Sequence, residues 1–222
     1  SWNGSAWTEV ADLNTARSNL HGVGTSTATL AYFGQSAPGG GGYSALNESW
    51  NGSAWTETAD GNTARGGGAG MGTSYTACFM VGGYAPTNAV VESWNGSAWT
   101  EVSDLNTARL EVGAAGPYTA ALCFGGTPGP GALTEDWDGS SWTEVNDLNT
   151  GRAFLTGGGS SFTSAIVLNS EASSPNVADI AIPPTGTTAT SKFKLIPRGK
   201  PVNIGPTLIL TVSSPKAAVN EF

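Results

Sequence analysis

The chain has 222 residues, which is enough for one or two domains and for a buried core. Glycine supplies 32 residues, roughly double its usual share, and charged residues make up only 12%, which argues against a helix bundle or a coiled coil. The net charge of −8 argues against a nucleic-acid partner, because the chain cannot neutralise a row of phosphates. The apolar runs are short, so we expect no membrane insertion, and no signal peptide is visible. The chain opens on Ser1 rather than Met, and we expect a processed or partly resolved chain.

A segment of 17 residues occurs four times and indicates the architecture. The copies are residues 1–17, 49–65, 93–109 and 136–152. All eight tryptophans lie in these copies, in pairs five residues apart: Trp2, Trp7, Trp50, Trp55, Trp94, Trp99, Trp137 and Trp142. Each copy ends on an arginine, namely Arg17, Arg65, Arg109 and Arg152. A period near 45 residues without a helical pattern predicts the blades of a β-propeller.

Each unit is predicted to contain four strands. Two strands follow the arginine, a variable loop follows them, and a tryptophan hairpin ends the unit. Asn51-Gly52 predicts a two-residue type I′ turn. In that register Trp50 lies opposite Ser53 and Trp55 lies opposite Glu48, so the two tryptophans are diagonal neighbours on one face. Stacked blades would bury these pairs.

The order of these features resembles the kelch repeat of β-propellers. An apolar strand ending in Gly-Gly, a variable loop, an aromatic-Asp turn, a second tryptophan and a closing arginine follow one another in Phe124-Gly125-Gly126, Trp137-Asp138, Trp142 and Arg152. The resemblance covers residues 1–170, although the first unit has Gly34-Gln35 in place of Gly-Gly. The tryptophan tracts also resemble, more loosely, repeat arrays of structural proteins from marine bacteriophages.

We therefore predict an all-β chain, with a kelch-like β-propeller at 1–170 and a β-rich C-terminal tail at 171–222. Whole units span 18–65, 66–109 and 110–152, and residues 153–170 share a fourth blade with residues 1–17. The four blades are predicted to close into a ring through pairing of N- and C-terminal strands, which removes exposed sheet edges. The alternatives are an open fragment and an arc completed by another chain.

The tail differs from the repeats in composition and charge. Residues 1–170 carry a net charge of −10, whereas residues 171–222 carry +2 and contain no tryptophan. Strands are predicted at 177–182, 192–196 and 207–213. We expect the tail to anchor the propeller to other structural proteins of the same assembly, or to cap it.

The residues that could carry chemistry are few. His21 is the only histidine, and a hydrolase triad needs a histidine base, so we predict no enzymatic activity. Cys78 and Cys123 lie in apolar strands and are expected in the core rather than in a disulfide or metal pair. The four repeat arginines are expected to bridge neighbouring blades. Their expected partners are carbonyl groups or the repeat acids Glu9, Glu57, Glu101 and Glu144.

Four aspartates recur once per unit, namely Asp12, Asp60, Asp104 and Asp147. A ring could gather them into a carboxylate tetrad that binds Ca²⁺. The alternative is four solvated loop acids, and otherwise we expect neither a metal nor a cofactor.

The loops after the Gly-Gly strands differ between units while the tryptophan hairpins hardly change, which is the layout of a binding surface. The candidate binding residues are Gln35, Tyr43, Tyr84, Thr87, Asn88, Tyr118 and Thr127. We predict a non-enzymatic structural or binding module on a virion or extracellular surface, such as a bacteriophage tail fibre, receptor-binding or capsid-decoration protein. Its expected partners are a cell-surface glycan or protein and further copies of itself. The alternatives are a carbohydrate-active enzyme or lectin on a propeller scaffold, and a kelch-type protein-interaction adaptor.

Overall fold

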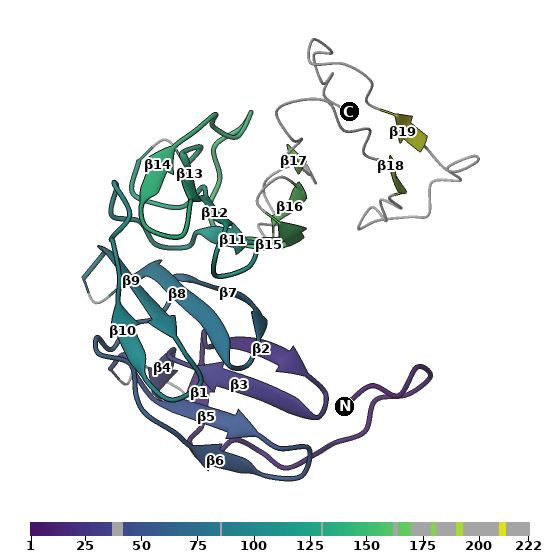
Figure 1. Cartoon of the computed structure of the whole chain (residues 1–222). Helices are drawn as coiled ribbons and strands as arrows, with labels where there is room; N and C mark the ends of the chain where they lie inside the picture. The colour runs from purple at the N-terminus through teal and green to yellow at the C-terminus, as the bar shows by residue number, and fades with distance from the viewer. Residues whose placement is uncertain are drawn as a thin grey trace.

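The computed structural model describes residues 1–36, 42–84, 86–129, 131–161 and 164–169, together with three short strands in the tail (Figure 1). The described residues form strands and turns without a helix, so the all-β prediction is confirmed. No helix that could cross a membrane occurs within these ranges.

Three antiparallel sheets of four strands follow one another along the chain. The first contains β2 (His21–Thr25), β3 (Ala28–Tyr32), β5 (Asn47–Trp50) and β6 (Trp55–Glu57). The second contains β7 (Ala69–Ser74), β8 (Ala77–Gly83), β9 (Asn88–Trp94) and β10 (Trp99–Glu101). The third contains β11 (Gly113–Ala115), β12 (Ala121–Phe124), β13 (Thr134–Trp137) and β14 (Trp142–Glu144). Each sheet pairs its strands in chain order, with the tryptophan hairpin outermost, as predicted.

The remaining strands are short or form a smaller sheet. β15 (Leu155–Ser161), β16 (Ser164–Asn169) and β17 (Asp179–Ile180) form a fourth sheet. β1 (Arg17–Ser18) pairs with β4 (Gln35–Ser36), and β18 (Thr190–Lys192) pairs with β19 (Ile209–Thr211). β17 and β19 fall within predicted tail strands, whereas β18 ends at the first residue of the predicted strand 192–196. The other tail residues lie outside the described ones.

The predicted pairing of the N- and C-terminal strands does not form between the described residues. The edge of β16 is taken by β17, with Ile166 opposite Ile180. Residues 1–10 instead lie beside the first sheet, where Trp2 and Trp7 pair with each other and line a groove with Trp50 and Trp55. The described sheets therefore follow an open arc (Figure 1).

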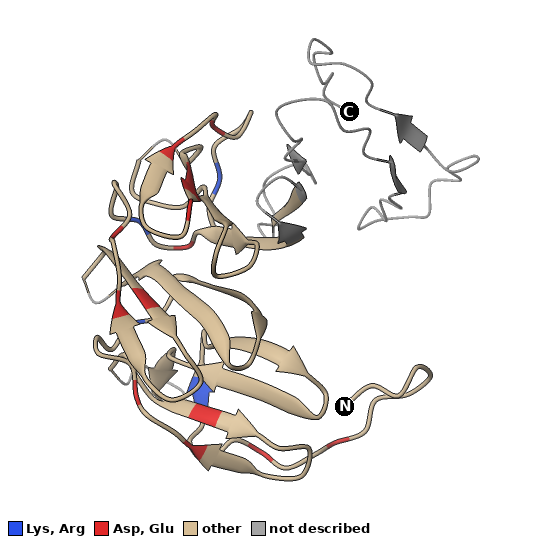
Figure 2. Ribbon diagram, viewed as in Figure 1, with Lys and Arg blue, Asp and Glu red and all other residues tan. Residues whose placement is uncertain are grey.

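The first strands of the four sheets, β2, β7, β11 and β15, are neighbours along the inside of this arc, and we call them the inner strands (Figure 1). The first two strands of the three four-stranded sheets carry no charged residue. Their charges lie on the outer two strands and in the connections (Figure 2). Uncharged strands suit this position because the sheet faces are buried against one another.

Aromatic side chains fill the spaces between sheets. The ring of Trp99, from the second sheet, lies 5.3 Å from Tyr32 and 5.0 Å from Phe33 of the first. Trp137 of the third sheet lies 5.5 Å from Phe79 of the second, edge to face. The tryptophan pairs of the second and third sheets are therefore buried between sheets, as predicted, and each such ring contributes roughly 1.5–3 kcal/mol through burial. The prediction is wrong for Trp2 and Trp7, which are 50% and 79% exposed.

The register of the tryptophan hairpins differs from the prediction. Trp50 lies directly opposite Trp55, with ring centroids 5.4 Å apart, and Glu48 lies opposite Glu57. The loop has four residues because the Asn51 Oδ1 atom accepts bonds from Ser53 N, Ser53 Oγ and Ala54 N, each at 2.9 Å. This side-chain turn needs a positive φ only at the glycine, whereas a type I′ turn needs it at both positions.

Candidate binding site at the inner strands

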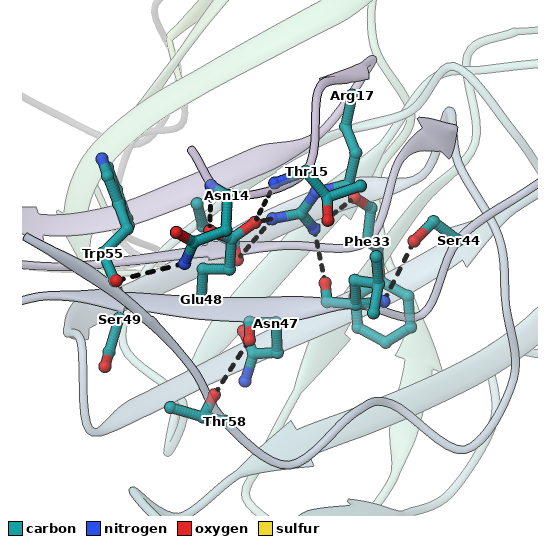
Figure 3. Close-up of polar contacts among 12 residues, drawn as sticks. Asn14, Thr15, Arg17, Phe33, Ser44, Asn47, Glu48, Ser49, Trp55 and Thr58 are labelled. Atoms are coloured by element: carbon teal, nitrogen blue, oxygen red, sulfur yellow. Dashed lines mark hydrogen bonds and ion pairs between the residues drawn. The ribbon is translucent and has the colours of Figure 1, made fainter. Parts of the chain in front are cut away.

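A buried ion pair holds each of the three complete sheets to the chain segment that enters it. We call the segments 12–17, 60–65 and 104–109 the crossover segments, because each connects one hairpin to the next inner strand. In the first, Arg17 Nη2 donates to Glu48 Oε1 at 2.9 Å and Asn14 N donates to Glu48 Oε2 at 2.7 Å (Figure 3). Arg17 Nη1 also donates to the carbonyl of Phe33 at 3.1 Å. The crossover segment is thereby fixed across the first sheet.

The same bonds recur in the next two sheets. Asn62 N donates to Glu92 Oε2 at 2.7 Å, and Arg65 pairs with Glu92 Oε1. Asn106 N donates to Glu135 Oε2 at 2.7 Å, and Arg109 Nη2 donates to Glu135 Oε1 at 2.7 Å. The paired side chains are at most 2% exposed.

The repeat arginines donate to backbone carbonyls, as expected, but their acidic partners are not the acids expected from the repeat. Glu57, Glu101 and Glu144 are exposed on the fourth strand of each sheet, and Glu9 is exposed near the N-terminus. The acceptors Glu48, Glu92 and Glu135 lie opposite those three acids on the third strand, where the crossover segment passes. Each lies one residue before a repeat copy and therefore outside the repeated segment.

A cavity of about 520 Å³ lies where the four inner strands begin, and we call it the inner-strand cavity. Leu20 and His21 line it from the first sheet, and Gly66–Gly68 from the second. Residues 110–112 line it from the third, and residues 154–156 from the fourth. Its volume is within the range of small-ligand sites, roughly 300–1,000 Å³.

One position in each unit has a left-handed backbone at this cavity. It lies two residues after each repeat arginine, at Asn19 (φ 50°), Gly67 (φ 68°), Glu111 (φ 58°) and Phe154 (φ 55°). Glu111 N donates to the carbonyl of Gly67 at 2.5 Å, so these residues connect neighbouring sheets. A left-handed conformation costs about 1–2 kcal/mol for most residues, whereas glycine, and to a lesser degree asparagine, adopts it more readily. Three of the four units nevertheless carry a side chain there.

Three of the predicted binding residues meet at the inner-strand cavity. Gln35, Tyr43 and Tyr84 line it, and the rings of Tyr43 and Tyr84 lie 5.3 Å apart at an angle of 61°. Asn19 Nδ2 donates to Gln35 Oε1 at 3.0 Å. Thr127 Oγ1 donates to Glu111 Oε2 at 3.1 Å, which places a fourth predicted residue beside the cavity.

The other predicted binding residues lie elsewhere. Tyr118 is in the turn between β11 and β12, at the opposite end of the third sheet, and its carbonyl accepts a bond from Trp137 Nε1 at 3.0 Å. Thr87 and Asn88 are at the start of β9. Two hydrogen bonds fix Asn88 within the second sheet. Its carbonyl accepts from Arg109 N at 3.2 Å, and its Nδ2 atom donates to the carbonyl of Pro86 at 3.2 Å.

Burial sets the protonation of the reactive side chains near the inner strands. Burial, with the nearby charge of Arg65 adding to it, lowers the pKa of His21 to about 4, so this side chain is neutral at pH 7. Burial raises the pKa of both Cys78 and Cys123 to about 12, and both are free, buried thiols. The prediction that the cysteines are core residues is therefore confirmed.

The repeat aspartates are exposed in all four units, and two of them bond to their own sheets. Asp104 Oδ1 accepts from Val91 N at 3.3 Å, and Asp147 Oδ1 accepts from Thr134 N at 3.2 Å. Across the described ranges, no three His, Cys, Asp or Glu side chains come close enough to share a metal ion. The Ca²⁺ tetrad stays a prediction.

The alignment of the repeats did not identify the left-handed positions as candidate binding residues. The signal was present, because the residue two places after each repeat arginine is different in all four units. No family model matches the chain, and the search of curated proteins found no similar protein.

Proposed function

We propose that the chain is a non-enzymatic binding module whose sheets are blades of a kelch-like β-propeller with four blades. The observation that carries the proposal is the contrast between a constant framework and a variable cavity. Each of the three buried ion pairs joins a repeat arginine to the Oε1 atom of a glutamate at the equivalent position of the next sheet. The left-handed positions at the inner-strand cavity carry four different residues. Such a framework holds differing side chains rigidly around one site.

The setting we propose is a surface assembly such as a bacteriophage virion, with the chain as a tail-fibre, receptor-binding or capsid-decoration component. The resemblance of the tryptophan tracts to phage repeat arrays supports this setting, as does the acidic charge of residues 1–170. The tail at 171–222 would attach the propeller to other proteins of that assembly or to further copies of the chain.

A carbohydrate-active enzyme is the competing function. Glycoside hydrolysis uses two carboxyl groups roughly 5–10 Å apart. Among the described residues that line the inner-strand cavity, Glu111 is the one carboxylate. This lining favours binding over hydrolysis.

The experiment that tests the binding function uses the full chain, fluorescently labelled, on intact bacterial cells. Tyr84→Ala should reduce cell binding at least tenfold, because Tyr84 lines the cavity and is 47% exposed. Tyr75→Ala is the matched control, since Tyr75 is 39% exposed in the turn between β7 and β8, at the opposite end of the sheet. Equal binding by the two variants would refute a binding role for the cavity. Antibody labelling of purified virions tests the setting separately.

A further inference from the structure

We propose that the inner-strand cavity binds a neutral carbohydrate, which stacks on Tyr43 and Tyr84 and hydrogen-bonds to Asn19, Gln35 and Glu111. The inference rests on the proposed function, because it names the ligand class of the same cavity. Four features of the lining carry it: the aromatic rings, the polar groups, the charge and the backbone conformation.

The aromatic rings offer faces of the kind on which sugars pack. Tyr43 and Tyr84 contact each other edge to face at 61°, so their rings do not form one flat surface. Phe154, which is half-exposed, adds a ring from the start of β15. A pyranose presents C–H groups on its faces and hydroxyls around its edge. Aromatic rings pack on the C–H groups, and nearby polar groups hydrogen-bond to the hydroxyls.

The polar groups suit hydroxyl partners. Amides donate and accept hydrogen bonds, and a carboxylate accepts two or more, which matches neighbouring hydroxyls that act as both donors and acceptors. The Asn19–Gln35 bond at 3.0 Å and the Thr127–Glu111 bond at 3.1 Å hold these groups in place before a ligand arrives. Preorganised groups lose less entropy on binding.

The charge of the lining selects against acidic sugars. Glu111 is negative, and the described lining residues include neither lysine nor arginine. Burial keeps His21 neutral, since it lowers the pKa of this residue to about 4. A sialylated or sulfated sugar would therefore meet repulsion without a compensating cation.

The backbone conformation indicates that the side chains themselves are needed. A Cβ atom built on Gly67 would meet no heavy atom within 4 Å, so space does not require glycine there. The left-handed conformation alone favours glycine, yet Asn19, Glu111 and Phe154 keep side chains in the same conformation. Backbone strain of this kind is concentrated at ligand-binding and active sites.

A peptide fits the cavity less well than a sugar does. Extended peptides commonly add a strand to an exposed sheet edge. At the cavity, the chain beside the inner strands is already bridged, with Gly66 opposite Tyr84 and Leu110 opposite Thr127. The described lining therefore offers aromatic faces and side-chain hydrogen bonds rather than a free strand edge.

The test is isothermal titration of the full chain with lactose, maltotriose and chitotriose as neutral probes, and 3′-sialyllactose as the acidic probe. We expect at least one neutral probe to bind, and 3′-sialyllactose to bind at least tenfold more weakly than lactose. Tyr43→Ala, Tyr84→Ala and Glu111→Gln should each weaken the neutral sugar at least tenfold, while Tyr75→Ala should leave its affinity unchanged.

A second readout separates a ligand role from a structural one. Glu111→Gly should lose sugar affinity like Glu111→Gln but unfold at a higher temperature, because glycine relieves the left-handed strain that glutamine keeps. Equal melting temperatures for the two variants would refute the strain component. Failure of every neutral probe to bind would overturn the sugar assignment, as would binding that Tyr84→Ala leaves intact. If cells or a peptide still bind and Tyr84→Ala abolishes that binding, the proposed function stands without the sugar.

Discussion

Phe33 and Gly61 depart from the repeat in opposite senses, and the structure brings them together. Phe33 holds the position of the first glycine in the Gly-Gly pairs, with a left-handed φ of 56°. The first unit therefore has Phe33-Gly34 at this place, and the predicted alignment of Gly34-Gln35 with the glycine pairs is wrong by one residue, because Gly34 N bonds to the Arg65 carbonyl as Gly83 N bonds to that of Arg109. Gly61 holds the position of a leucine in the other copies. The corresponding pairs in the next two units are Gly82 with Leu105 and Gly125 with Leu148. A Cβ atom on Gly61 would lie 2.2 Å from Phe33 Cζ, so the phenyl ring occupies the space of the missing leucine.

This exchange predicts strong coupling between the two sites. Phe33→Gly removes a fully buried ring that packs on Trp99 and lies under the Arg65 guanidinium at 4.7 Å. The loss of about 3–5 kcal/mol of packing, less about 1–2 kcal/mol of relieved strain, leaves a net destabilisation of about 1–4 kcal/mol. Gly61→Leu alone overpacks the site by about 1–3 kcal/mol. The double variant recreates the glycine–leucine pair and should unfold within about 1 kcal/mol of the parent chain.

Urea denaturation of the four proteins, followed by tryptophan fluorescence and circular dichroism, measures the cycle. We expect a favourable coupling of at least about 1 kcal/mol between the two substitutions. Phe33→Gly combined with Glu144→Gln is the control, and should be additive within about 0.5 kcal/mol because Glu144 is exposed on the third sheet. If the double variant lost as much free energy of unfolding as the two single variants together, the idea that the Phe33 ring replaces the missing leucine would be refuted.

Three further predictions concern the framework. Glu135→Gln should lower the free energy of unfolding, measured in urea, by about 3–5 kcal/mol, because it leaves the buried Arg109 charge without its partner. The same change at exposed Glu144 is the control and should stay within about 0.5 kcal/mol. Equal effects of the two changes would refute the role of the Arg109–Glu135 pair. Because folding lowers the pKa of His21 from 6.5 to about 4, only the unfolded chain binds a proton between these values, so stability should fall by up to about 3 kcal/mol as the pH drops from 6.5 to 4. His21→Gln should flatten that part of the stability profile, and an unchanged slope would contradict this origin. Asn51→Ala should lower the free energy of unfolding by about 1 kcal/mol, because it removes the side-chain oxygen that accepts the turn's main-chain bonds. Asp138 accepts the equivalent bonds in the third sheet, so Asp138→Asn should leave the melting temperature at pH 7 unchanged. A large fall in the melting temperature of Asp138→Asn would show that the charge is required.

Periodicity in the sequence predicted the features that every unit shares. The 17-residue copies indicated a hairpin with its tryptophan pair on one face, and the apolar runs between the copies indicated the other two strands of each unit. The hairpin register was predicted incorrectly because Asn51 acts through its side-chain oxygen, which a rule for backbone φ does not capture.

Contacts between residues far apart in the chain could not be predicted from the repeated segment. Glu48 lies 31 residues from Arg17, just outside the copy that contains its strand neighbours, so aligning the copies alone did not reveal the pair. Closure by residues 1–17 was predicted from complementary halves, and the edge taken by β17 depends on tail residues without a repeat pattern. The left-handed positions were missed because a varying residue is usually interpreted as unconstrained.

The crossover segments have a consequence for how such a chain folds and evolves. Arg17, Arg65 and Arg109 each bond to an acid 26–31 residues further along, within the unit that the arginine introduces. Each of these three ion pairs therefore joins the end of one unit to the sheet of the next. Folding can then advance along the chain one unit at a time, without waiting for distant segments to meet. Because the arginine and the glutamate recur at equivalent positions, duplicating one whole period would give the added unit the same ion pair.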